Sequence, residues 1–247
     1  MIACLSALLL LRMPVAAQTP AGTIPADSTT RIGWRQVAIG IGVVAAASTL
    51  DVPIANAFAG PERAGTLNTA RQFDRFGDLT GAVPILGGLA IVSLATHNHK
   101  LGKVTLRAAV SWALASAMTD GTKYLVGRLR PYADPDLDAL DFRFYSGSPS
   151  FPSGHATAAF ALATSLGDAI GHDWARVGLY GLAGGTAWAR LAEHDHWFSD
   201  VVGAAAIGIL SSKWTSGKWR VFGLRAPKLL IGPGTVVVSV PMPQPRH

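Results

Sequence analysis

The chain has 247 residues, of which 49% are hydrophobic and 15% are charged, and its mean hydropathy is +0.32. This length suits one domain rather than two. A typical soluble domain is more polar, with about 25% charged residues, so we expect a membrane protein or a tightly packed helical protein. The formal charge of +6 comes from residues 201–247, which hold 6 of the 21 Lys and Arg and no acidic residue. Because these basic residues are sparse and the chain around them is apolar, nucleic-acid binding is not expected.

Residues 1–17 resemble an export signal. Residues 2–11 are apolar, and the small residues at 15–17 suit cleavage of a signal peptide. Because no basic residue precedes the apolar run and Arg12 follows it, an uncleaved membrane anchor is the alternative. Residues 18–32 are rich in Pro, Thr, Gly and Asp, which predicts a linker.

Six apolar segments follow, each long enough for a helix and none with the alternation of a strand. The sequence therefore predicts an all-α fold, a six-helix bundle over residues 33–215. Small residues recur at helical spacing, as in Gly178, Gly181 and Gly185 and again at Gly208, which predicts close contact between helices. The predicted helices are residues 34–50, 79–96, 104–130, 154–170, 175–191 and 200–213.

The bundle is predicted to be embedded in a membrane or associated with one. Only residues 79–99 run uncharged for the roughly 20 residues that a membrane-spanning helix needs. If all six segments span, the positive-inside rule places the connections at 51–78, 131–152 and 192–199 outside the cytoplasm. A cleaved signal conflicts with this orientation, so either the N-terminal run is retained or the bundle lies in the periplasm or on its membrane surface.

Residues 216–247 are predicted to form a basic C-terminal tail. Its cations can contact anionic lipid head groups, or they are simply solvated. Residues 228–231 and the β-branched run at 235–240 flank a Gly-Pro-Gly turn, which predicts a small β-hairpin. The basic residues near this end are Lys213, Lys218, Arg220, Arg225, Lys228 and Arg246.

Lys123 and Arg130 are the first residues that suggest a phosphate site. They are seven residues apart, close to two helical turns, so both are predicted on one face of the third helix, which Pro131 ends. A long Lys and the fork of an Arg can grip one phosphate from two sides. Taken alone, a Lys and an Arg at this spacing are more often boundary cations, whose side chains extend from the apolar bundle to a polar interface. Arg128 is interpreted as a cation of this kind.

The tetrapeptide Pro152-Ser153-Gly154-His155 stands directly before an apolar run. Ser153 is the predicted N-cap of that helix, so the first backbone amides point outward without a partner and favour an anion. Gly154 lets the backbone come close to the anion, and His155 stands beside it. The alternative is an ordinary cap followed by a hydrogen-bonded histidine.

His196 and Asp200 are four residues apart at the start of the last predicted helix, and are therefore predicted on one face of it. A carboxylate that accepts a hydrogen bond from one ring nitrogen fixes the tautomer and leaves the other nitrogen free to attack. Arg190 ends the preceding helix on the same side. A lone His–Asp pair is more often structural, but this one completes a set that suits phosphoryl transfer without a metal.

Together the three groups resemble the signature of the type 2 phosphatidic acid phosphatase and vanadium haloperoxidase superfamily. That signature is Lys, six residues and Arg-Pro, then Pro-Ser-Gly-His, then Ser-Arg, five residues, His, three residues and Asp. The chain matches it between residues 123 and 200, except that Ala189 replaces the usual serine. The missing hydroxyl bears on the fine positioning of the substrate, not on the core chemistry.

The resemblance implies His196 as the nucleophile, His155 as the general acid and Asp200 as the residue that orients His196. It implies no metal or other cofactor, and vanadate is expected to bind as a mimic of phosphate. The implied phosphate ligands are Lys123, Arg130, Ser153, Gly154 and Arg190.

The predicted function is hydrolysis of phosphate monoesters or diphosphates through a phosphohistidine. A lipid such as phosphatidate or a polyprenyl diphosphate is the expected substrate, because the site would open at the mouth of an apolar bundle; a soluble ester is the alternative if the bundle is periplasmic. Two other functions stay open, a vanadate-dependent haloperoxidase and a membrane protein that binds lipid phosphate without catalysis. The expected location is the bacterial cell envelope, in the inner membrane with the site facing the periplasm, or the periplasm itself.

Other polar groups are given no catalytic role. His97 and His99 are interpreted as part of a solvated turn, and the acidic loop at 134–141 lacks the central glycine and final glutamate of a calcium loop. The loop residues 193–195 (Glu-His-Asp) are expected only to tune access of the substrate.

Overall fold

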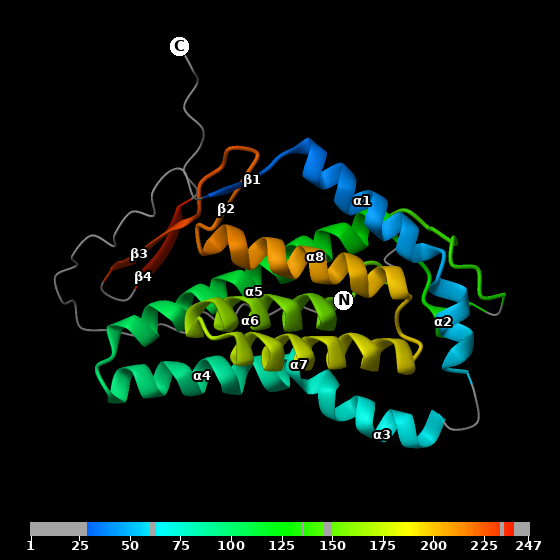
Figure 1. The fold of residues 1–247 in the computed structure, drawn as a ribbon, viewed down its shortest axis with the longest axis horizontal. Coiled ribbons are helices and arrows are strands. Elements are labelled where there is room, and N and C mark those ends of the chain that lie inside the picture. Colours follow the sequence, from blue (N-terminus) through cyan, green and yellow to red (C-terminus); the bar gives the residue numbers. More distant parts are fainter. Residues whose placement is uncertain (1–28, 60–62, 135, 146–149, 233–234, 240–247) are drawn as a thin grey trace, which may run out of the picture.

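Eight α-helices make up most of the described part of the chain (Figure 1). The computed structural model describes residues 29–59, 63–134, 136–145, 150–232 and 235–239, so the predicted signal peptide and most of the predicted linker lie outside the described residues. Every predicted helix is present, which confirms the all-α fold. The helices are α1 Trp34–Ser48, α2 Asp51–Ala57, α3 Arg63–Asp74, α4 Leu79–Ala95, α5 His99–Val126, α6 Gly154–Ile170, α7 Asp173–Ala192 and α8 Phe198–Thr215.

Two of these helices, α2 and α3, lie in residues 51–78, where the sequence predicts only a connection. Pro53 sits in the first turn of α2, where its missing N–H leaves no hydrogen bond unmade. α3 is too polar to be recognised by hydropathy, yet it packs against α7. The hydroxyl of Thr186 donates to the carbonyl oxygen of Phe73 at 2.7 Å across this contact.

A short 3-10 helix, η2 Arg75–Gly77, joins α3 to α4. Asp78 follows η2 and caps α4, because its side chain accepts from the amide of Leu79 at 2.6 Å. η2 packs against α6 and α7 as well as α3 and α4. The chain between α3 and α4 therefore runs along the end of the bundle where α6 begins.

α6 lies among α5, α7 and α8 and forms the centre of the bundle (Figure 1). Its buried residues include several alanines, such as Ala159, so the neighbouring backbones come close. A Cβ at Gly208 of α8 would lie 2.5 Å from the carbonyl oxygen of Thr157, a contact that only glycine avoids. The prediction that small residues mark close helix contacts is right there but wrong at Gly178 and Gly181, where a Cβ would meet nothing within 4 Å.

The ends of two helices differ from the prediction. α5 stops at Val126 because Gly127 adopts the left-handed conformation, with φ 58°, and its amide donates to the carbonyl of Lys123 at 2.9 Å. Arg130 is extended, with φ −83° and ψ 150°, so it does not share a helical face with Lys123. α8 begins only at Phe198, and His196 consequently precedes the helix that carries Asp200.

The described strands form two small pairs. β1 Thr30–Ile32 lies parallel to β2 Trp219–Val221, and the antiparallel pair of β3 Lys228–Gly232 and β4 Thr235–Ser239 confirms the predicted hairpin. Two cations near this end are already paired, since Asp168 of α6 accepts from Lys213 at 2.7 Å and lies 3.1 Å from Lys218.

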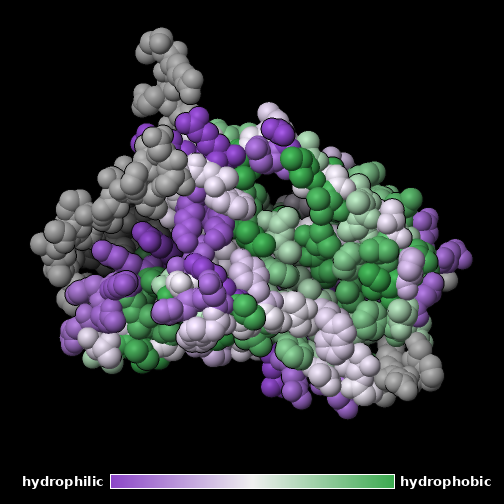
Figure 2. Space-filling model, viewed as in Figure 1, coloured by the Kyte–Doolittle hydropathy of each residue, from purple (hydrophilic) through white to green (hydrophobic). Residues whose placement is uncertain are grey.

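No described helix is by itself long and apolar enough to cross a bilayer. Two bent pairs of helices together reach that length and hydropathy: α1 with α2, at an angle of 46°, and residues 65–77 with α4, at 47°. Figure 2 shows hydrophobic residues gathered over α1 and the adjoining end of α8. On α1, Trp34 is 77% exposed and Ile41 is 65% exposed.

Candidate active site

The three predicted groups converge at one end of the bundle, where α6 and α8 begin and α7 ends (Figure 1). The amide of Ser153 donates to the backbone oxygen of Asp200 at 3.3 Å, which ties the start of α6 to the first turn of α8. Lys123, from the last turn of α5, reaches the same place, since its Nζ would lie 3.8 Å from a Cβ on Gly154. Segments far apart in sequence therefore meet around one small volume.

The start of α6 has the features expected of an anion site. Ser153 is the N-cap, as predicted, and its hydroxyl accepts from the amide of Ala156 at 3.5 Å. The amides of Gly154 and His155 belong to the first turn and have no partner within the helix. The helix dipole adds partial positive charge at this point.

Lys123 adds a positive charge beside these amides. Burial lowers the pKa of its ammonium, and so does the nearby charge of Arg130, whereas Asp120 and Asp200 act in the opposite direction. Arg130 thus lies near Lys123, although it stands in an extended segment after Gly127 and not on α5.

Arg190, in the last turn of α7, is buried and surrounded by carboxylates. Its guanidinium contacts Asp74 at 2.9 Å and Glu193 at 2.5 Å, and it also pairs with Asp195. Asp74 lies at the end of α3, in a segment that the sequence analysis treats as a connection. Glu193 and Asp195 are expected from the sequence only to tune access, so their contact with Arg190 is a finding of the structure.

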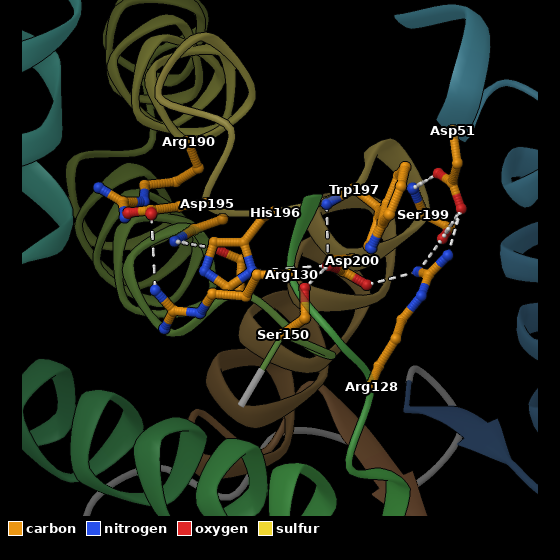
Figure 3. Close-up of polar contacts among 12 residues, drawn as sticks. Asp51, Arg128, Arg130, Ser150, Arg190, Asp195, His196, Trp197, Ser199 and Asp200 are labelled. Carbon is orange, nitrogen blue, oxygen red and sulfur yellow. Dashed lines mark hydrogen bonds and ion pairs between the residues drawn. The ribbon is translucent and has the colours of Figure 1, made fainter. Parts of the chain in front are cut away.

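Asp195 also lies 3.5 Å from Arg130, and it therefore stands between two of the predicted phosphate ligands (Figure 3). The Nε atoms of Arg130 and Arg190 are buried and have no hydrogen-bond acceptor within the described chain. Buried donors of this kind are rare unless something else satisfies them.

His196 is almost fully buried, with 3% of its surface exposed. Burial lowers its pKa to about 4, although Asp200 acts to raise it, so the imidazole is neutral near pH 7. Its Nδ1 faces Asp200 Oδ2 at 3.5 Å. The predicted pairing of these two residues is thus present, although a loop and a helix start supply them rather than one helical face.

Asp200 is itself fully buried and is held by several donors. Its Oδ2 accepts from the amide of Trp197 at 2.9 Å and from the hydroxyl of Ser150 at 2.5 Å. Burial would raise the pKa of this carboxyl, but the nearby imidazole of His196, the charge of Arg128 and the hydrogen bond from Ser150 together lower it. The carboxylate is therefore ionised under ordinary conditions.

His155 lies in the first turn of α6 with its ring partly exposed. Its Nε2 is 3.6 Å from Asp74 Oδ2 and 4.0 Å from Asp78 Oδ1. Burial lowers its pKa, as does the charge of Arg190, while the two carboxylates act to raise it. Asp74 thus contacts both the predicted general acid and a predicted phosphate ligand.

The interpretation of Arg128 as a cation at an interface is wrong. Its side chain is buried, and it bridges Asp200 and Asp51, at 2.6 Å in each case (Figure 3). Ser199 joins this network, since it accepts from Arg128 at 2.7 Å and its amide donates to Asp51 at 2.7 Å. The sequence carries no signal for Asp51, which lies at the start of the unpredicted helix α2.

Ala189, which replaces the family serine, does not face the phosphate ligands. It is buried in an apolar cluster with Ala70 of α3 and Ala192, next to Phe73 and Trp188. A hydroxyl at this position would meet apolar neighbours.

In the described part of the chain, no three His, Cys, Asp or Glu side chains are grouped so as to hold a metal ion.

Comparison with known proteins finds relatives in sequence and in fold. The chain is 33% identical over 132 residues to the lipid A 1-phosphatase of Porphyromonas gingivalis, a match that covers 52% of this chain and 27% of that relative. The chain thus spans about a quarter of the length of this relative. The crystal structure of Aquifex aeolicus LpxE superposes with a TM-score of 0.51 over 66% of this chain and 92% of that one, at 20% identity, which supports the fold.

Residues 104–221 match the PAP2 superfamily, and this range contains all three predicted groups, from Lys123 to Asp200. The match begins in α5 and ends in β2, so it includes the helices α6, α7 and α8 that carry the site. The matched part of the chain, residues 104–221, therefore belongs to the PAP2 superfamily, that of the type 2 phosphatidic acid phosphatases.

Proposed function

We propose that this chain is a phosphatase that hydrolyses phosphate monoesters or diphosphates of lipids, with His196 as its nucleophile. The observation that carries the proposal is a neutral, buried imidazole next to Asp200, at the point where Lys123, Arg190 and the start of α6 meet. A neutral His196 keeps the lone pair on Nε2, and the surrounding cations attract the phosphoryl group that this atom attacks.

The reaction has two steps. In the first, Nε2 of His196 forms a bond to phosphorus, the bond to the leaving oxygen breaks, and His155 gives its proton to that oxygen. In the second, water gives a proton to His155 while its oxygen bonds to phosphorus, and the N–P bond breaks to release inorganic phosphate. Lys123, Arg130 and Arg190 stabilise the charge on the equatorial oxygens in both steps.

The protonation of His155 is coupled to the substrate. Burial and Arg190 lower its pKa in the free site, which by itself disfavours an acid. A bound phosphate dianion brings negative charge next to the ring and raises the pKa again. His155 therefore becomes a competent proton donor when substrate is present.

A phosphate would also complete the hydrogen bonding of the site. The buried Nε donors of Arg130 and Arg190 need acceptors, and phosphate oxygens are strong acceptors for guanidinium groups. Vanadate, with similar geometry, should occupy the same place and inhibit. The residues present need no metal for this chemistry, because three fixed cations supply the positive charge.

Lipid is the proposed substrate class for two reasons. The relative from Porphyromonas gingivalis is a lipid A 1-phosphatase. In addition, exposed apolar side chains lie close in sequence to the phosphate ligands, among them Tyr124, Tyr132 and Phe144. We accordingly place the protein in the bacterial cell envelope, at a membrane, with its site open to the periplasmic side.

The test is phosphate release by the purified protein in mixed micelles. A lipid A phosphate, phosphatidate, a polyprenyl diphosphate and soluble p-nitrophenyl phosphate would be compared, with and without EDTA, and membrane and soluble fractions would be assayed separately. We expect EDTA-resistant release from a lipid, loss of release in His196→Ala, and an acid-labile phosphoryl label on the wild-type protein only. Normal release by His196→Ala, or halide oxidation with vanadate and peroxide in place of phosphate release, would overturn the proposal.

A further inference from the structure

The two carboxylate oxygens of Asp200 have different partners. Oδ2 faces His196 and accepts from Ser150 and from the amide of Trp197, whereas Oδ1 accepts from Arg128 at 2.6 Å. A carboxylate bound at both oxygens cannot rotate about its terminal bond. The contact with Arg128, together with those at Oδ2, therefore fixes the plane of the carboxylate that faces the imidazole.

Arg128 has no N–H group left for a phosphate. A guanidinium has five N–H donors, and Arg128 makes five hydrogen bonds: to Asp51, Ser199 and Asp200, and two to the carbonyl of Ala139. Arg130, two residues later, has the opposite character, because its Nε is unsatisfied. The two arginines of this segment consequently have different tasks.

The surroundings of Arg128 hold it rigidly. The rings of Trp197 and Phe142 lie 5.3 and 5.5 Å from the centre of its guanidinium, and Asp51 is fully buried behind it. Asp51 also binds both the amide and the hydroxyl of Ser199, at 2.7 Å each, which fixes it to the start of α8. The chain of contacts runs from α2 through Arg128 to the carboxylate that faces His196 (Figure 3).

We propose that Arg128 is a positioning residue for phosphoryl transfer: it fixes the orientation of Asp200, and through Asp200 the tautomer of His196, while Asp51 holds Arg128 in place. This role rests on the proposed function, because it acts on the same nucleophile. It does not involve contact with the substrate.

The charges around Asp200 should make the positioning role of Arg128 visible in the pH dependence of the rate. Asp200 directly faces His196 and Arg128, with Asp51 beyond Arg128, and the more distant cations are Lys123 of α5 and Arg190 of α7. If the Arg128 contact is lost, the buried carboxylate keeps its desolvation cost and loses a positive partner, so its pKa rises. A protonated Asp200 no longer supports the imidazole, and the acid limb of the pH–rate profile should move to higher pH.

The test compares Arg128→Lys and Asp51→Asn with the wild-type enzyme. An ammonium has three donors and no planar fork, so Lys cannot make the five bonds of Arg128. We expect kcat to fall about 100-fold in Arg128→Lys, which is the loss seen when a residue that orients a metal ligand by a hydrogen bond is removed. The affinity for vanadate should change by less than about threefold. Asp51→Asn should give a smaller fall in kcat. The acid limb should shift upward in Arg128→Lys, because its ammonium no longer makes the contact with Asp200 Oδ1, whereas Asp51→Asn removes a negative charge and should not shift the limb upward.

Asp168→Asn is the matched control, because it removes another largely buried ion pair, with Lys213 at the opposite end of α6 and α8. It should lower thermal stability without moving the pH profile. If Arg128→Lys and Asp51→Asn lose activity only in proportion to their folded fraction, with an unchanged profile in Arg128→Lys, Arg128 is structural and the inference is wrong. If Arg128→Lys does not fold, the kcat of Asp51→Asn, corrected for its folded fraction, decides whether Arg128 has the positioning role.

A readout without turnover separates this inference from the proposed function. Nitrogen-15 NMR of labelled histidines, assigned by difference from His196→Ala, reports the tautomer of His196. We expect one tautomer, protonated at Nδ1, in the wild-type protein and a mixture in Arg128→Lys. A wild-type protein that releases no phosphate would overturn the proposed function, whereas an unchanged tautomer in Arg128→Lys would overturn the positioning role.

Discussion

Gly77 lies directly against the backbone of His155: a Cβ at Gly77 would come within 2.2 Å of the carbonyl oxygen of His155. Gly77 ends η2, the turn between Asp74 and Asp78, and both of these carboxylates face the ring of His155. This close backbone contact therefore brings two acidic residues to the predicted general acid.

Gly77→Ala should disturb this arrangement. The extra methyl group meets backbone rather than a movable side chain, so η2 has to shift, at a cost of about 1–3 kcal/mol of stability. We expect a lower melting temperature and a fall in kcat, measured on the lipid substrate. Gly87→Ala in α4 is the control, since a Cβ there meets nothing within 4 Å, and it should leave kcat unchanged. Equal behaviour of the two variants would contradict the contact.

Asp200→Asn should separate binding from catalysis. The amide can still accept one hydrogen bond, but it no longer stabilises the imidazole tautomer that attacks, and a comparable change in a catalytic triad lowers kcat by about 10⁴-fold. We expect a loss of kcat of about 10³- to 10⁴-fold, with vanadate binding retained. A rate close to that of the wild-type enzyme would remove Asp200 from the mechanism.

Asp195→Asn should strengthen the binding of oxyanions. Asp195 pairs with both Arg130 and Arg190, so it competes with phosphate for the same two cations. Removing its charge should tighten vanadate inhibition by about 3- to 10-fold, as expected for a loss of about 1 kcal/mol of competing interaction. Asp141→Asn, which loses only the exposed pair with Arg143, should have no effect. Weaker inhibition in Asp195→Asn would mean that Asp195 orients the arginines instead of competing.

The protein should lose stability in acid partly through His196. Its pKa is about 4 in the folded chain, against an ordinary histidine value of 6.5 in the unfolded chain, so the unfolded chain binds more protons between these two values. Stability therefore falls as the pH drops from 6.5 toward 4, by roughly 3 kcal/mol at most from this group. Unfolding measured across this range should show a smaller slope in His196→Asn than in the wild-type protein. Identical slopes would mean that His196 is not buried as a neutral group.

The sequence predicts the helices and the main site residues because both rest on local patterns. Apolar runs identify α1 and α4 to α8, and the spacing from Lys123 to Asp200 singles out residues that the fold brings to one end of the bundle. The contacts of Arg128 could not be predicted, since its partner Asp51 is 77 residues away and lies in a seven-residue helix that the sequence analysis treats as a connection. Asp74 was missed for the same reason.

Other errors came from treating helices as longer than they are. Seven residues between Lys123 and Arg130 fit two helical turns, but Gly127 ends α5 between them. Four residues between His196 and Asp200 fit one face, but the helix begins at Phe198. In both cases the two side chains still lie near each other, although the chain between them is not helical throughout.

The glycine and alanine contact between α6 and α8 has a further consequence for the site. At Gly208 and Thr157 the two helices touch through atoms that have no rotamers, so this contact loses no side-chain entropy on folding and has no alternative packing to adopt. The two helices carry the anion-binding amides and Asp200 at their first turns. The distance between the anion-binding amides and Asp200 is therefore fixed by direct contact between the backbones of α6 and α8. Rotamer changes of side chains in the core should alter this distance little.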